Sequence, residues 1–193
     1  MTADQIKEIA LIHFTENGYE GTSMAQIAND VGIKKQSIYT HFKGKDELFL
    51  RVYKDVFASE LNFVLDFIEN NQTRSIEEFL YDFLLDYRSR YEGNVNTKFW
   101  LRISFFPPMH LEQEVLEYSY AYLDKLEGLL VPIMEKAIEK KEISSDIDAG
   151  LATAAFLGVL DGIVVEMLYG GPERLVKRLA ASWHFYWRGL SKD

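Results

Sequence analysis

Residues 22–42, TSMAQIANDVGIKKQSIYTHF, are the stretch that decides the fold. Ser23 and Gln26 stand three apart just ahead of an apolar pair, which is the spacing of a capping box at a helix start. The pattern predicts a short helix that ends near residue 30, a tight turn around Gly32, and another short helix over residues 34–42. Two short helices joined at a glycine-containing turn are typical of a helix-turn-helix.

In a helix-turn-helix the second helix presents its first side chains to base edges in the major groove of DNA. Here the side chains able to hydrogen-bond a base or a phosphate are Lys34, Lys35, Gln36, Ser37 and Thr40. Four lysines and no acid lie between residues 31 and 45. A lysine stretch is by itself typical of a solvated helix face, and helical hairpins are common, so spacing alone leaves both interpretations open.

Outward from this stretch, apolar residues recur at three- and four-residue spacing, and no sustained two-residue alternation is present. The sequence therefore predicts an all-α fold of about nine helices. The further helices are expected at about 3–17, 45–70, from Ser75 onward, 95–106, 112–141, from Ser144–Asp148 to Gly170-Gly171, and from Pro172 to the end. The fourth of the nine, over 45–70, carries two adjacent apolar stripes, and we expect it to join two subdomains.

The composition is that of a globular protein with a core, because 48% of the residues are apolar and 26% are charged. The formal net charge is −9, so the chain as a whole is not a polycation that binds DNA indiscriminately. The first 18 residues lack the pattern of a signal peptide. The longest apolar run, 149–160, stops at Asp161, short of the roughly 20 residues of a membrane span. We expect a cytoplasmic protein with no membrane anchor.

The sequence contains no cysteine, which excludes disulfides, thiolate metal sites and a cysteine nucleophile. Its four histidines, at 13, 41, 110 and 184, have no pair at the spacing of a helical metal site. It has no glycine-rich phosphate loop and no serine elbow. We therefore expect no cofactor, no metal and no enzymatic activity.

The N-terminal residues resemble those of the TetR-like (tetracycline repressor) bacterial transcriptional regulators. The resemblance covers about residues 4–50. It is carried by Phe14, Gly18-Tyr19, Thr22-Ser23, Ile27-Ala28, Val31-Gly32-Ile33, Lys35, Ser37-Ile38-Tyr39, His41-Phe42, Lys45 and Glu47-Leu48. It implies a helix-turn-helix DNA-binding domain over 1–46 and a larger helical ligand-binding and dimerisation domain over 47–193.

The resemblance also implies roles for single residues. Lys35, Gln36, Ser37 and Thr40 are expected to face the major groove. Phosphate contacts are expected from Tyr39, His41 and Lys45, and from backbone amides at Thr22 and Ser23. The chain departs from the family at Lys34, where a capping serine or threonine is usual, and at Gln36, where glycine is frequent. Losing the cap costs about 1 kcal/mol, and both changes can shift base preference.

In TetR-like proteins the middle helices enclose a ligand cavity, so the aromatic residues between 74 and 134 are candidate pocket residues. The apolar candidates are Trp100, Phe105, Phe106, Met109, Tyr120, Met134 and Phe156, and the polar candidates are Arg102, His110 and Asp161. Aromatic residues at helical spacing are more often simply core, so we expect about half of this set to lie outside any pocket.

The last two helices are expected to form a homodimer interface, because small residues along 149–168 let another helix approach closely. Bundle core is the competing interpretation. A dimer would place two recognition helices on an inverted-repeat operator in double-stranded DNA. The sequence thus predicts a dimeric repressor released from DNA by a small apolar or amphipathic effector. The alternative is a helical ligand-binding or protein-interaction module whose DNA-binding domain no longer works.

Overall fold

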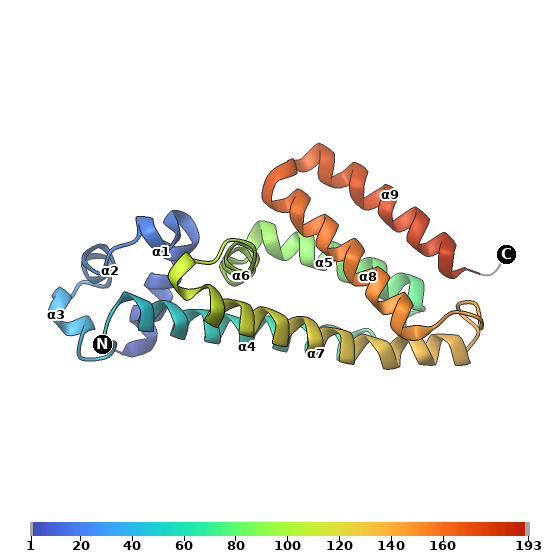
Figure 1. Ribbon diagram of the computed structural model, residues 1–193, viewed down its shortest axis with the longest axis horizontal. Coiled ribbons are helices and arrows are strands. Elements are labelled where there is room, and N and C mark those ends of the chain that lie inside the picture. Colours follow the sequence, from blue (N-terminus) through green and yellow to red (C-terminus); the bar gives the residue numbers. More distant parts are fainter. Residues whose placement is uncertain (1, 192–193) are drawn as a thin grey trace. The chain divides into compact units, whose positions relative to one another are not determined.

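The computed structural model describes residues 2–191, which are helical with short connections and contain no strand (Figure 1). The elements are α1 (Ala3–Gly21), α2 (Met24–Val31), α3 (Lys35–Ile38), α4 (Lys45–Asn70), α5 (Ile76–Gly93), α6 (Val95–Phe105), the 3₁₀ turn η1 (Met109–Leu111), α7 (Glu112–Glu139), α8 (Ala149–Val165), the π-helical segment η2 (Glu166–Gly170) and α9 (Pro172–Leu190). The predicted all-α class is confirmed over the described chain.

Local sequence signals set several of these helix ends. At the start of α2 the Ser23 hydroxyl accepts a hydrogen bond from the Gln26 amide at 3.2 Å, and the Gln26 side chain accepts one from the Ser23 amide at 2.8 Å. The start of α5 has the same arrangement between Ser75 and Glu78, at 3.3 Å in each direction. Pro172 occupies the first turn of α9, where its missing amide hydrogen costs nothing.

Two of the predicted helices have different ends in the structure. The first continues past the predicted stop at residue 17, but it bends there, because Gly18 has φ 71° and ψ 179°, a conformation that favours glycine. The helix predicted over 34–42 is only Lys35–Ile38, and tighter turns follow it. In those turns the amides of His41 and Phe42 donate to Ile38 O at 2.9 and 3.0 Å.

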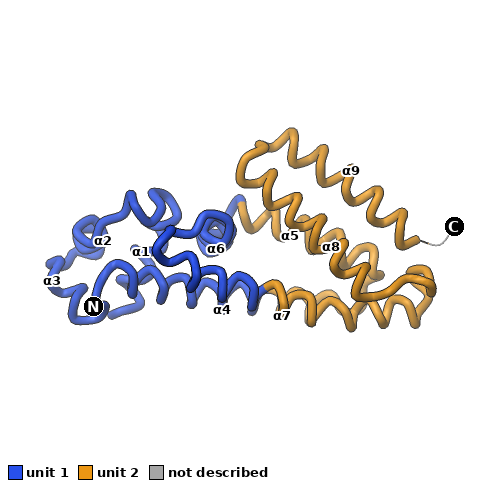
Figure 2. Tube along the Cα trace, viewed as in Figure 1, with its two compact units in different colours: residues 1–63, 92–122 blue, residues 64–91, 123–193 orange. Residues whose placement is uncertain are grey.

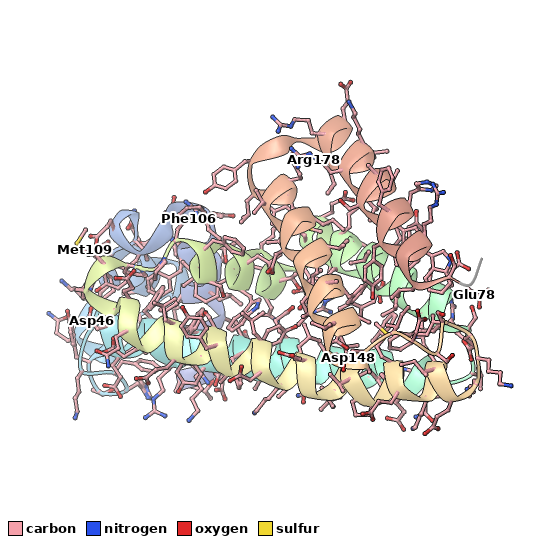
Figure 3. The ribbon with its side chains drawn as sticks, turned by 45° about the vertical axis from the view of Figure 1, so that its right-hand side comes forward. Asp46, Glu78, Phe106, Met109, Asp148 and Arg178 are labelled. Atoms are coloured by element: carbon pink, nitrogen blue, oxygen red, sulfur yellow. The ribbon has the colours of Figure 1, made fainter. Side chains whose placement is uncertain are left out.

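The helix predicted to end at Gly170-Gly171 does end there, but the α-helix gives way to the π-helical η2 after Val165. In η2 the Glu166 carboxylate is buried, and it lies 3.3 Å from Arg174 Nε and 3.5 Å from Arg178 Nε. A Cβ at position 170 would overlap this carboxylate, so a larger residue there would require the Glu166 side chain to move. Figure 3 shows Arg178 on α9 and Asp148 at the first turn of α8.

The chain divides into two compact units (Figure 2). One comprises the residues up to 63 together with 92–122, and the other comprises 64–91 and the residues from 123 onward. Helices α4, α5 and α7 therefore contribute to both, in line with the two apolar stripes of α4. The predicted boundary at residue 46 separates a DNA-binding domain from a ligand-binding and dimerisation domain. It divides the chain by function and not by compactness, and it stays a prediction.

Each unit has an aromatic core. In the first unit Tyr53 stacks on Trp100 with ring centroids 5.0 Å apart. The Tyr53 hydroxyl lies 2.9 Å from the hydroxyls of both Ser104 and Ser119, and burial raises its pKa to about 12. In the second unit Phe83 lies 6.1 Å from Phe156, centroid to centroid. Aromatic residues at helical spacing therefore contribute to both cores.

The segment Ala149–Gly170 has 22 residues and a mean hydropathy of 1.9, so length and composition alone would let it cross a membrane. The apolar run 149–160 does stop at Asp161, but apolar residues continue after it along the helix. The core helix of a soluble protein meets the same criterion, which makes this weak support for a span.

Candidate nucleic-acid interface

The start of α2 is held against α1 by Thr22. Its side chain is buried, and its Oγ1 lies 2.7 Å from Gly18 O and 3.0 Å from His13 O. A second tie joins the two helices farther along, where His13 Nε2 lies 2.8 Å from Asp30 Oδ2. Hydrogen bonds from Asn29, and then from His13, lower the pKa of Asp30.

The turn between α2 and α3 depends on Gly32, which has the left-handed conformation φ 78°, ψ 33°. Its amide donates to Asn29 O at 3.0 Å, and the Ile33 amide donates to Ala28 O at 2.9 Å, so the last carbonyls of α2 are satisfied. The buried side chains of Ile38 and Phe42 then fix the inner face of α3 and of the turn after it.

This anchoring leaves a continuous polar surface on α3 and its flanks. The exposed side chains on it are Lys34, Lys35, Gln36, Tyr39, Thr40 and His41, and Ser37 is partly exposed. Lys34 is the N-cap of α3 and makes no side-chain capping bond. The structure thus brings together the side chains predicted to face DNA, and their DNA contacts stay a prediction.

Three predicted phosphate contacts already have partners inside the protein. Lys45 Nζ donates to Tyr19 O at 2.9 Å and to Thr22 O at 3.0 Å, and it lies 3.9 Å from the centre of the Tyr19 ring. The Thr22 amide donates to Tyr19 O, and the Ser23 amide donates to the Gln26 side chain. These groups hold the end of α1 and the start of α2, and a phosphate would have to compete for them.

The predicted pocket residues lie in several different surroundings. Trp100, Met134 and Phe156 are buried in the cores. The exposed candidates are Phe105, Phe106 and Met109, around the end of α6, and Tyr120 on α7 and Asp161 on α8. Figure 3 labels Phe106 and Met109 at this end of the first unit. Arg102 and His110 contact α1 or residues beside it. The structure does not gather the ten into one cavity, and their role in binding stays a prediction.

A hollow with a volume of about 800 Å³ lies in the first unit, along the start of α4 and beside Tyr118 of α7. Its lining includes Lys43, Arg51, Lys54 and Tyr118. A smaller hollow of about 310 Å³ in the second unit is lined in part by Arg74, Lys136 and Lys140. None of the ten predicted pocket residues lines either one. Sequence reasoning missed the α4 hollow, although basic residues at helical spacing on α4 were a usable signal.

Among residues 2–191 no group of three or more His, Cys, Asp or Glu side chains is arranged to hold a metal ion.

Comparison with known proteins agrees with this geometry. A model of the family described as bacterial regulatory proteins, tetR family, matches residues 8–52, which include α2 and α3. The biofilm operon icaADBC HTH-type negative transcriptional regulator IcaR of Staphylococcus aureus (strain Newman) is 36% identical over 91 residues, covering 46% of this chain and 48% of that protein. The chain thus spans about half the length of the curated relatives it matches.

Solved structures show the same fold over nearly the whole chain. The transcriptional regulator FadR from Bacillus subtilis, in complex with stearoyl-CoA, superposes with a TM-score of 0.68 at 22% identity, covering 96% of this chain and 97% of that one. A TetR-family regulator from Agrobacterium tumefaciens gives a TM-score of 0.75 at 17% identity, covering 98% and 97%. Residues 8–52 therefore match the model of the tetR family of bacterial regulatory proteins, and the chain shares the fold of solved TetR-family regulators.

Proposed function

We propose that the protein is a DNA-binding transcriptional repressor that acts in the cytoplasm as a homodimer. The observation that carries the proposal is the polar surface of α3, in which exposed donors surround a short helix anchored by Ile38 and Phe42. The similarity to IcaR, whose name describes a negative regulator, supports repression over activation.

Specific DNA recognition would come from three side chains in the first turn of α3. Lys35 can donate to guanine, and the Gln36 amide can pair with the edge of adenine in the major groove. Ser37 can bond to either. Thr40, just after the helix, would also face the major groove, and Tyr39 and His41 would contact phosphates and fix the register of the helix on the duplex.

The dimer would form through α8 and α9, which lie side by side as a hairpin in the second unit (Figure 1). The exposed stripe on α8, continued by Tyr169 of η2, is nearly free of charge. On α8 it consists of Leu151, Ala154, Ala155, Gly158, Asp161, Gly162 and Val165. On α9 the exposed apolar residues include Val176 and Phe185, at 52% and 71% exposure. Apolar surface of this extent is typical of an interface.

The effector would be a small amphipathic or apolar molecule bound by the larger helical region. The fold shared with FadR, which was solved with stearoyl-CoA, supports an amphipathic ligand with a long apolar part. The effector must bind the DNA-free state more tightly than the DNA-bound state, because only a difference in affinity shifts the equilibrium. A thermal-shift screen against fatty acids and acyl-CoA esters tests this, since a ligand that binds the native state raises its apparent stability.

DNA recognition is tested by selecting duplexes that bind the dimer from a random pool. The enriched duplexes are then footprinted with the protein. We expect a protected inverted repeat with half-sites about 34 to 36 Å apart or a multiple of this distance. The double variant Lys35→Ala with Tyr39→Ala should lose this protection and remain dimeric in sedimentation. The matched control, Gln72→Ala on the connection after α4, should protect DNA as the wild type does.

Failure to enrich any inverted repeat at moderate salt would contradict the proposal. Thermal shifts with ligands that persisted in that case would favour the alternative, a ligand-binding module with a non-functional DNA-binding domain. The observation that favours this alternative is that Lys34, the N-cap of α3, makes no side-chain capping bond.

A further inference from the structure

We propose that Arg102 and His110 are positioning residues that hold the bent end of α1, and through it the start of α2, in the orientation that DNA binding needs. This inference rests on the proposed function and deepens it. It also gives the two residues a different role from the effector contact that the sequence suggested.

Arg102 projects from α6 onto the backbone of α1. Its Nη1 donates to Thr15 O at 2.7 Å and lies 3.4 Å from Glu16 O. These carbonyls belong to the last turn before the bend at Gly18, where a helix lacks amide partners for its final carbonyls. A guanidinium at that place satisfies them and carries the charge that a helix C-terminus favours. Position 18 faces the same guanidinium, because a Cβ there would lie 3.7 Å from Arg102 Nη2.

His110 contacts the other side of the bend. Its ring lies 4.9 Å from the Tyr19 ring, centroid to centroid, and its Nε2 lies 3.4 Å from Asp46 Oδ1. The Tyr19 hydroxyl donates to the same carboxylate oxygen, and this bond is the main reason that the pKa of Asp46 is lowered. Asp46 lies in the first turn of α4, at the same end of the unit as Met109 (Figure 3).

The bend leads directly to the recognition elements. Gly18 O contacts the Thr22 hydroxyl at 2.7 Å, and the Lys45 ammonium joins Tyr19 O to Thr22 O. Thr22 precedes the N-cap of α2, so the bend and the helix start are fixed together. A shift of the end of α6 or of η1 would therefore reach α2 through backbone atoms of residues 15–22.

The test compares Arg102→Met and His110→Ala with the wild type. The matched control is Lys98→Met, which removes one positive charge from the same helix at a side chain with no recorded partner. Amide hydrogen exchange is followed in peptides covering residues 15–24, without DNA. We expect exchange there to speed up about tenfold in Arg102→Met, the size of one lost charge-assisted hydrogen bond, while peptides of α8 and α9 stay unchanged. Arg102→Lys, which keeps a positively charged hydrogen-bond donor group at this position, should restore slow exchange.

A second measurement uses the duplex selected with the wild type. Affinity for it should fall about tenfold in Arg102→Met and His110→Ala, with thermal midpoints close to that of Lys98→Met. Equal exchange in Arg102→Met and Lys98→Met overturns the proposal, and so does faster exchange throughout the chain, which would make the role general stability. If the wild type selects no duplex, the proposed function fails, and the exchange measurement still decides whether the two residues hold the bend.

Discussion

At Lys45 the ammonium group lies within 3.0 Å of two backbone carbonyls and over the Tyr19 ring, so it stabilises the fold whether or not it contacts DNA. Lys43, two residues earlier, has an exposed side chain with no recorded partner. We expect Lys45→Met to lower the free energy of unfolding by about 1 kcal/mol, near the low end for hydrogen bonds to charged groups. Lys43→Met should change the free energy of unfolding by no more than about 0.5 kcal/mol relative to the wild type. Urea denaturation measures both, and equal midpoints for the two variants would show that the Lys45 contacts contribute nothing.

Two glycines should respond oppositely to the same substitution. Gly32→Ala meets no neighbouring atom, but it forces alanine into a left-handed conformation, which costs about 1 kcal/mol. Gly128 lies on an exposed face inside α7, also with open space around it, so Gly128→Ala should raise stability by about 0.8 kcal/mol. The thermal unfolding midpoints of the two variants, compared with that of the wild type, test both predictions. A gain in stability at position 32 would mean that the turn can adopt another conformation.

At the scale of elements, α3 begins with an N-cap residue, Lys34, that cannot cap the helix but carries a positive charge suited to DNA. Lys34 has the extended backbone of an N-cap, φ −72° and ψ 141°, but offers no acceptor to the free amides of the helix. Lys34→Ser should therefore stabilise the protein by about 0.5 to 1 kcal/mol, and it should weaken DNA binding because a cation is lost. Chemical denaturation and titration of the selected duplex separate the two effects. The control is Lys35→Ser, which loses the same charge at a position that cannot cap. A fall in stability for Lys34→Ser would show that the lysine makes contacts of its own.

Helix starts were predictable because their signals are local. Ser23 with Gln26 and Ser75 with Glu78 form reciprocal hydrogen bonds within four residues, and nothing distant can change them. The π-helical end of α8 was not predictable, because it surrounds a Glu166 carboxylate whose arginine partners lie on another helix. The same limit applies to α3, since the buried Ile38 and Phe42 fix its short length through packing.

The polar surface of α3 and the surroundings of the pocket candidates were predictable to different degrees, for a related reason. The surface is one continuous segment, so its order along the chain already indicates its chemistry. A pocket forms where apolar side chains leave space between them. The sequence periodicity of apolar residues is the same whether they pack in a core or line a cavity. Trp100 illustrates this, because it is buried and stacks on Tyr53, a contact that its spacing in the sequence does not reveal. Arg102 likewise reaches the backbone of α1, and its position on α6 alone gives no sign of that contact.

At the scale of the whole molecule, the net charge of −9 coexists with a cationic surface at α3. Lys34, Lys35 and Lys43 are exposed there, while the acids nearest to them have partners: His13 for Asp30, and the Lys43 amide for Glu47. Because Coulomb repulsion acts between DNA and the acidic remainder, this surface should be the main place where DNA approaches. Placement of charge, rather than its total, makes an acidic chain compatible with a nucleic-acid partner.

Asp161 couples the stability of the whole molecule to pH. It is the one charged residue of the exposed stripe on α8 described above. Part of its side chain reaches solvent, but the desolvation of the remainder raises the pKa of its carboxyl. A carboxyl whose pKa is higher in the folded than in the unfolded chain binds protons more readily when folded, so its ionisation costs stability above the folded pKa. That cost disappears as the pH falls below the pKa of the carboxyl in the unfolded chain, which is about 3.9.

Asp161→Asn should therefore be more stable than the wild type at pH 7, with a gain in stability that shrinks towards zero near pH 3. Chemical denaturation at a series of pH values measures the gain, and Asp124→Asn on the exposed face of α7 is the control. A loss of stability at pH 7 in Asp161→Asn would instead place a cation of the partner subunit beside this carboxylate in the dimer.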